Sequence, residues 1–180
     1  MRITLLLATL LATCTFAGCS REVTRQQVAE FIDKADDAAR KRFAPEICAL
    51  RGKDFVLRST FHAQDAREPA ELEMTRKLFC RQAGDFARLR QYRLERKTMD
   101  IDVATDRKSA TVTAEYVETM PFYEPYSQPA TPDDFRQFQV VRSTDVSVVG
   151  IEDGELVFLS TTSDAHQSLI NKNEVDIPYE

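Results

Sequence analysis

The sequence contains few of the residues from which common catalytic and binding motifs are built. It has two histidines, five glycines and no tryptophan in 180 residues. No P-loop, dinucleotide fingerprint, nucleophile elbow or zincin helix occurs in it. The two histidines, His62 and His166, are far apart in the chain and do not have the spacing of a zinc motif or a catalytic triad. We therefore expect no catalytic residues, no metal site and no cofactor, and we interpret both histidines as surface residues.

A basic surface and a membrane-spanning run are also missing. The chain has 24 basic and 29 acidic residues, a net charge of −5, which argues against nucleic acid as a partner. The apolar stretch at the N-terminus is about 15 residues long, whereas a membrane-spanning helix needs about 20. We expect neither nucleic-acid binding nor a resident transmembrane helix.

The N-terminal stretch has the features of an export signal. Arg2 precedes an apolar run from Ile3 to Ala12. The segment Phe16-Ala17-Gly18-Cys19 then resembles the lipobox of bacterial lipoproteins, except that Phe16 stands where that family usually has an aliphatic residue. The resemblance implies a signal peptide at 1–18, a lipid-modified (palmitate-bearing) Cys19, a short tether at 19–22 and, because Ser20 follows, sorting to the periplasmic face of the outer membrane. The alternative is an ordinary secretory signal that leaves Cys19 as a free thiol.

The cysteine count predicts a disulfide. Of the four cysteines, Cys14 lies in the signal peptide and Cys19 is the lipidation site, so Cys48 and Cys80 remain as a pair in an oxidising compartment. A bridge between them closes a loop of about 33 residues and is worth about 3–4 kcal/mol. The alternative is two separate buried thiols.

The first half of the chain has the periodicity of helices. Thr24 and Gln27 form a capping box at the start of an amphipathic helix of about 20 residues, and Pro45 begins a short second helical turn. The stretch 55–61 is compatible with either a helical turn or a short strand. Pro69 is expected to open a third helix, which places Leu72, Phe79, Ala83 and Phe86 on one face.

After about residue 91 the period changes to two, which indicates antiparallel strands. Strands are expected at 99–103, 110–116, 135–149 and 155–162, with turns at 105–108 and at Glu152-Asp153-Gly154. Ser143-Thr144-Asp145 suggests a bend or bulge in the third of these strands. Residues from Gln167 onward are expected to form a loose polar tail.

This order of elements predicts an α+β fold, in which N-terminal helices pack on a curved four-stranded antiparallel meander. The order resembles that of the NTF2-like (cystatin-like cone) folds, in which a long N-terminal helix lies in the concavity of the sheet. The expected organisation is a single α+β domain at 23–165 followed by a polar tail at 166–180.

The segment 119–134 is the best candidate for a partner-binding surface. Its first 14 residues include four prolines and three aromatics, a composition typical of binding loops. The alternative is that the aromatic side chains cap the core. In addition, residues 115–180 hold 13 acidic and 3 basic residues, which either pair with helix cations or attract a cationic protein. The expected contact residues are Phe122, Tyr123, Glu124, Tyr126, Asp133 and Asp134.

Two hypotheses of function follow. The first is a lipid-anchored, non-enzymatic protein-binding module, such as an immunity or inhibitor protein against a cell-wall hydrolase or toxin. The second is a small-molecule carrier or NTF2-like enzyme that uses the cone. The second hypothesis requires an open cavity with at least one buried ionisable group, whereas a fully packed cone would exclude it. The residues expected to line that cavity are Phe31, Phe79, Val112, Ala114 and Tyr116. Taken by itself, Tyr116 is more typical of a core tyrosine with a hydrogen-bonded hydroxyl than of a catalytic residue.

Overall fold

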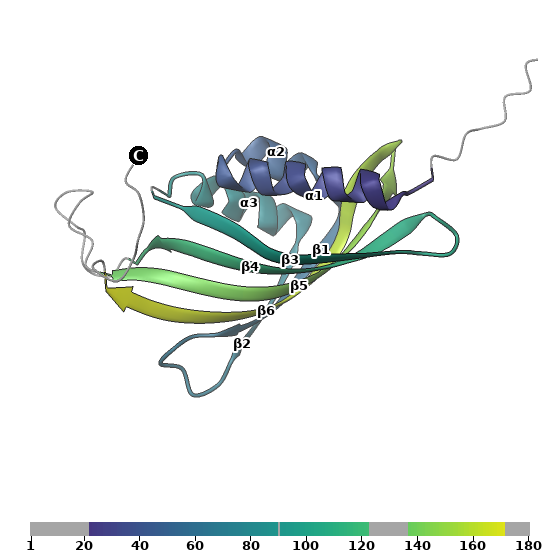
Figure 1. Ribbon diagram of the computed structural model, residues 1–180. Coiled ribbons are helices and arrows are strands. Elements are labelled where there is room, and N and C mark those ends of the chain that lie inside the picture. The colour runs from purple at the N-terminus through teal and green to yellow at the C-terminus, as the bar shows by residue number, and fades with distance from the viewer. Residues whose placement is uncertain (1–21, 90, 123–136, 172–180) are drawn as a thin grey trace, which may run out of the picture.

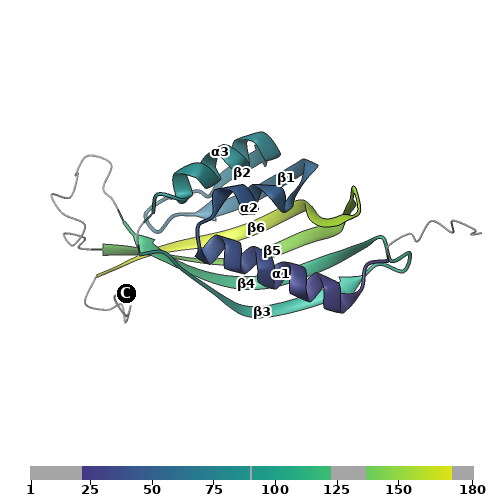
Figure 2. The same ribbon diagram turned by 90° about the horizontal axis from the view of Figure 1, so that it is seen from above.

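The helices lie on one face of a curved sheet (Figures 1 and 2). The computed structural model describes residues 22–89, 91–122 and 137–171. Within these residues there are three helices and six strands. In chain order they are α1 (Arg25–Arg40), α2 (Ala44–Ala49), β1 (Arg51–His62), β2 (Ala70–Thr75), α3 (Arg76–Phe86), β3 (Arg93–Val103), β4 (Ser109–Pro121), β5 (Gln137–Glu152) and β6 (Glu155–Asn171).

Helix α1 begins at the expected capping box and ends earlier than expected. The Thr24 side chain accepts a hydrogen bond from the Gln27 backbone, and the Gln27 side chain accepts one from the Thr24 backbone. The helix has 16 residues rather than about 20. It ends because Arg42 takes a left-handed backbone conformation with φ of 54°, which lets the Phe43 N–H bond back to the Ala38 carbonyl.

The sheet is larger than the predicted meander. Its strand order is β2-β1-β6-β5-β4-β3. Strands β3 to β6 form the expected antiparallel meander, but β1 adds to it in parallel with β6, and β2 pairs antiparallel with β1. The ambiguous stretch 55–61 is therefore part of a strand, and besides the neighbouring β2 its partner is β6, about a hundred residues further along the chain. Local sequence does not encode such a pairing.

The predicted start of the third helix at Pro69 is wrong. Residues Ala70–Thr75 form strand β2, and α3 starts at Arg76. The strand sequence Ala-Glu-Leu-Glu-Met-Thr consists mostly of good helix formers, so propensity favoured the wrong element. Pairing with β1 overrides that preference, although only Met74 of this strand is buried.

The β5–β6 hairpin confirms the predicted turn and corrects the expectations for its two strands. Asp153 and Gly154 both have positive φ, 50° and 85°, as the tight hairpin turn requires. Strand β5 pairs without a register shift through Ser143-Thr144-Asp145, so no bulge lies there, and the irregularity of the β5–β6 pairing lies at Val148/Val149 instead. Strand β6 continues to Asn171, beyond the expected domain boundary at 165, and includes His166.

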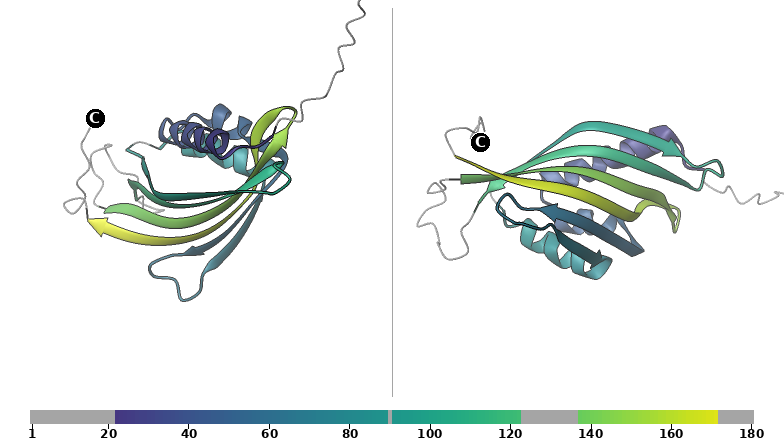
Figure 3. Two further views of the ribbon diagram at one scale, coloured as in Figure 1. Left: turned by 45° about the vertical axis from the view of Figure 1, so that its right-hand side comes forward. Right: turned by 90° about the horizontal axis from the view of Figure 1, so that it is seen from below.

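The core lies between α1 and the concave face of the sheet (Figure 3). The ring centroids of Phe31 on α1 and Phe158 on β6 are 4.9 Å apart. Beside this core, the predicted disulfide joins Cys48 on α2 to Cys80 on α3, with Cα atoms 5.4 Å apart. The expected signal peptide and Cys19 lie outside the described residues, and no helix within those residues has the length and apolarity to span a membrane.

Candidate ligand-binding site in the cone

An open cavity of about 340 Å³ lies between α1 and the concave face of the sheet. This volume is at the lower end of the range of small-molecule sites, about 300–1,000 Å³. One wall is apolar and includes Ile32, Leu57, Phe79, Val112 and Ala114. The cone is therefore hollow rather than fully packed.

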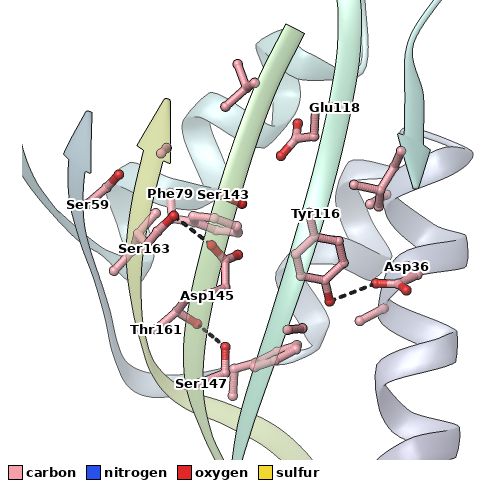
Figure 4. A pocket seen from close by; sticks show the side chains of 18 of the residues that line it. Asp36, Ser59, Phe79, Tyr116, Glu118, Ser143, Asp145, Ser147, Thr161 and Ser163 are labelled. Atoms are coloured by element: carbon pink, nitrogen blue, oxygen red, sulfur yellow. Dashed lines mark hydrogen bonds between the residues drawn. The ribbon is translucent and has the colours of Figure 1, made fainter. Parts of the chain in front are cut away.

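A polar stripe runs along the sheet on β1, β5 and β6, beside the apolar residues of β1 and β4 (Figure 4). The inward-facing residues of β5 include Ser143, Asp145 and Ser147. The Asp145 carboxylate accepts a 2.7 Å hydrogen bond from the Ser163 hydroxyl, and the Ser147 and Thr161 hydroxyls are hydrogen-bonded at 2.9 Å. The cavity thus has both apolar and polar lining, and an amphipathic molecule would contact both.

Arg51, the first residue of β1, provides a positive charge at this cavity. Its guanidinium carbon lies 5.2, 4.7 and 4.2 Å from the ring centroids of Phe55, Phe79 and Phe158. Its Nε and Nη1 atoms are buried and have no hydrogen-bond partner in the described part of the chain. Burial lowers the pKa of Arg51 to about 10, and the negative charge of Asp145 opposes that shift, so the group stays protonated at neutral pH.

Asp145 is the acid of the polar stripe, and it is half-buried. Burial raises the pKa of its carboxyl, while the hydrogen bonds from Ser163 and Ser143 and the charge of Arg51 oppose the rise. A carboxyl with a raised pKa in a cavity can accept or donate a proton closer to neutral pH than an exposed aspartate can.

A second acid reaches the cavity from α1. Asp36 is 4% exposed, and its Oδ1 accepts a 3.3 Å hydrogen bond from the Tyr116 hydroxyl of β4. Its Oδ2 lies 2.8 Å from Nη1 of Arg96, an ionic contact in which the two groups are not aligned as a hydrogen bond. Burial raises the pKa of Asp36 despite Arg96, and burial also raises the pKa of Tyr116. The hydrogen bond to Asp36 fixes the position of the Tyr116 ring in the cavity wall.

The third acid, Glu118, lies two residues along β4. It accepts a 2.9 Å hydrogen bond from the Tyr92 hydroxyl. Burial raises the pKa of the Glu118 carboxyl, and the hydrogen bond from Tyr92 opposes the rise. The cavity therefore presents three carboxyl groups, all with raised pKa, and the single guanidinium of Arg51 among the residues described for its lining.

The structure confirms most of the cavity lining expected for the second hypothesis. Phe79, Val112, Ala114 and Tyr116 line the cavity, whereas Phe31 packs against Phe158 instead. Tyr116 is both a packed tyrosine with a bonded hydroxyl and part of the cavity wall.

Sequence reasoning missed the charged groups of the cavity. Asp145 is in phase with the buried Val149 on β5, so strict alternation could have identified it as inward-facing. No comparable pattern marks Arg51, because its aromatic neighbours come from three different elements.

Of the predicted partner-binding residues, the structure describes only Phe122. It is half-buried just after β4, and its backbone N–H donates to the Gln137 carbonyl at 3.0 Å. Tyr123, Glu124, Tyr126, Asp133 and Asp134 lie outside the described residues. The two histidines, expected to be unrelated surface residues, are brought together on β1 and β6.

Comparison with solved structures identifies the fold. A putative scytalone dehydratase from Novosphingobium aromaticivorans superposes with a TM-score of 0.55 and 11% identity, over 86% of this chain and 88% of that chain. An NTF2-like protein of unknown function from Pseudomonas putida gives a TM-score of 0.51 and 12% identity, over 77% and 84%. The chain has the NTF2-like fold.

Enzymes are among the other proteins with this NTF2-like fold. The hexachlorocyclohexane dehydrochlorinase LinA-type3 from Novosphingobium barchaimii gives a TM-score of 0.58 and 8% identity, over 87% of this chain and 94% of that chain. No protein-family model and no curated protein matches the sequence. At these identities the likeness concerns the fold alone, so the function has to be argued from the cone of this chain.

Proposed function

We propose that this chain binds a small amphipathic organic anion, such as an aromatic carboxylate, inside its NTF2-like cone. The observation that carries the proposal is Arg51, whose buried Nε and Nη1 have no hydrogen-bond partner in the described residues and which lines an open cavity. A desolvated guanidinium with few partners is costly, and a ligand carboxylate beside it would compensate its charge. The surrounding phenylalanine rings would contact the apolar body of the same ligand.

The polar stripe supports the same ligand class. A carboxylate near Arg51 would also approach Asp145, the carboxyl that acts on Arg51 electrostatically. Because burial raises the pKa of Asp145, its protonated form can donate a hydrogen bond to the ligand anion instead of repelling it. We therefore expect binding of the anion to be accompanied by proton uptake and to weaken as the pH rises.

A matched pair of probes tests the proposal. 2-Naphthoate and 2-naphthamide have nearly the same shape and differ in charge, and isothermal titration calorimetry measures their affinities. We expect the wild type to bind the carboxylate about tenfold or more tightly than the amide, because a hydrogen bond to a charged group contributes about 1.5–3 kcal/mol. Arg51→Met should remove this preference. Equal binding of both probes to the wild type would contradict the proposal.

Two variants serve as controls. Arg142→Met removes an exposed arginine from β5 and should leave the affinity for both probes unchanged. Ala114→Phe fills the cavity from β4 and should block both probes. If Ala114→Phe still binds naphthoate with wild-type affinity, the ligand does not use the cone.

The position of Asp145 favours proton transfer as a second candidate function of the cone. A half-buried acid with a raised pKa that shares the cavity with a cation is suited to general acid–base catalysis on a bound anion. Exchange of acidic C–H protons of a bound carboxylate in D2O, followed by NMR, measures this activity. Catalysis predicts exchange that Asp145→Asn abolishes while binding persists, and absence of exchange for every bound acid supports a carrier.

The export and partner hypotheses are proposals that rest on sequence. The lipobox-like segment supports a lipid anchor at Cys19 on the periplasmic face of the outer membrane. Mass spectrometry of the protein from membranes tests the anchor, and unmodified Cys19 in a soluble fraction would contradict it. The aromatic and proline-rich segment 119–134 supports a protein partner, including the hydrolase or toxin of an immunity protein. Deletion of this segment should abolish capture of that partner without unfolding the domain.

A further inference from the structure

The only two histidines of the sequence lie side by side on the face of the sheet opposite the helices. His62 on β1 and His166 on β6 are Cα partners in the parallel pairing of these strands. Their ring centroids are 4.2 Å apart, and the ring planes differ by 5°. Their chain neighbours Phe61 and Ala165 line the cone, so the two imidazoles point away from it.

Asp164 completes a group of three possible metal ligands. Its Oδ1 lies 3.0 Å from Nε2 of His62 and 3.5 Å from Nε2 of His166. One donor atom from each residue can be chosen so that all three lie within 4.8 Å of one another. Asp164 and His166 are two residues apart on β6, and His62 of β1 is the cross-strand neighbour of His166. Because side chains two apart on a strand point to the same side, all three lie on one face of the sheet.

The spacing is close to what a bound metal needs. Two ligand atoms about 2.0–2.1 Å from a tetrahedral Zn²⁺ are about 3.3 Å apart. The two carboxylate–imidazole distances, 3.0 and 3.5 Å, already bracket this value. The side chains of His62, Asp164 and His166 are 36%, 60% and 62% exposed, so they can rotate toward a shared ion and water can fill its remaining positions.

The charge around the three residues limits the affinity. Arg142 on β5 is the cross-strand partner of His166 and brings a positive charge to the same face. On the other side, Glu71 of β2 accepts a hydrogen bond from Thr60, which is the partner of Asp164 in β1. The one carboxylate and two neutral imidazoles form a donor set suited to Zn²⁺, Cu²⁺ or Ni²⁺ rather than to Mg²⁺ or Ca²⁺.

We propose that His62, Asp164 and His166 form a surface site for one divalent transition metal ion, with Zn²⁺ as the reference ion. This site is on the opposite face of the sheet from the cone and does not depend on the ligand proposed for the cone.

Zinc titration of the full chain tests the site. The chain is prepared without an affinity tag and with Cys14→Ser and Cys19→Ser, so that no thiol outside the disulfide competes for zinc. Calorimetry should give one Zn²⁺ per chain. Because the chain has only two histidines, the imidazole ¹⁵N signals in an NMR spectrum report on the site directly, and both should shift together as zinc is added.

Three variants decide the outcome. His62→Ala, His166→Ala and Asp164→Asn should each weaken zinc binding by about tenfold or more, since loss of even an outer-sphere group costs 10–100-fold. Glu71→Gln removes a nearby carboxylate that is not one of the three ligands, and it should weaken binding far less than any of the three ligand variants. Circular dichroism and thermal unfolding of each variant show whether the fold is intact. Absence of zinc binding, or zinc binding that survives all three substitutions, overturns the proposal.

Discussion

At the scale of single residues, the cone is defined by charges that the fold leaves incompletely compensated. Arg51 has two buried nitrogens without hydrogen-bond partners in the described residues, and its compensation comes from three phenylalanine rings and the more distant Asp145. A protein selected for stability alone has no reason to retain such a group, because an apolar side chain of similar size would pack there without desolvating a charge.

Replacement of Arg51 therefore separates stability from function. Arg51→Met should leave the free energy of unfolding unchanged or raise it by about 1–2 kcal/mol, because a desolvated charge is removed while the contacts to Phe79 and Phe158 are kept. Urea denaturation measures this. A loss of more than about 2 kcal/mol would show that cation–π contacts make Arg51 a structural residue.

Asp145 should make the stability of the ligand-free protein depend on pH. Burial raises its pKa in the folded state above the ordinary 3.8, so the unfolded carboxyl ionises first as the pH rises. Stability relative to an asparagine variant must then fall from about pH 4 upward, until the pH exceeds the folded pKa. Calorimetry should show a Tm difference between wild type and Asp145→Asn that is more favourable to the wild type at pH 4.5 than at pH 7.5. A constant or reversed difference would mean that Arg51 dominates the electrostatics of Asp145.

At the scale of elements, helix caps and turn residues in the sequence predicted the structure correctly where a few adjacent residues decide it. Thr24 and Gln27 start α1, and Asp153-Gly154 makes the β5–β6 turn, because caps and tight turns depend on a few adjacent residues. Residues 70–75 show the opposite case. Their composition favours a helix, and only pairing with β1 makes them a strand.

The disulfide is the element-scale constraint that the sequence predicted and the structure contains. It joins α2 to α3 at the edge of the core. Its closed loop predicts a contribution of about 3–4 kcal/mol, so Cys48→Ala with Cys80→Ala should lower the Tm by about 10 °C. Differential scanning calorimetry of the oxidised wild type and the double variant measures this. An unchanged Tm would show that the helices are held by packing alone.

At the scale of the whole molecule, the sequence predicted the fold class and most of the expected cavity lining, but not the charged groups of the cavity. An order of helices followed by antiparallel strands was enough for the NTF2-like architecture, which proteins with about 10% identity share. The charged groups were missed because the wall is assembled from α1, α3 and all six strands, and no local pattern reveals which charged side chains converge. His62 and His166 lie side by side only because β1 pairs in parallel with β6, which no local pattern predicts either.

The central claim is that the cone of this NTF2-like protein binds an organic anion through Arg51. A crystal structure of the full chain with 2-naphthoate tests it most directly. We expect the naphthalene ring to lie against Phe79 and the apolar residues of the lining, with the carboxylate next to the Arg51 guanidinium. Naphthoate bound outside the cone, or bound inside it with its carboxylate turned away from Arg51, would contradict the proposed function.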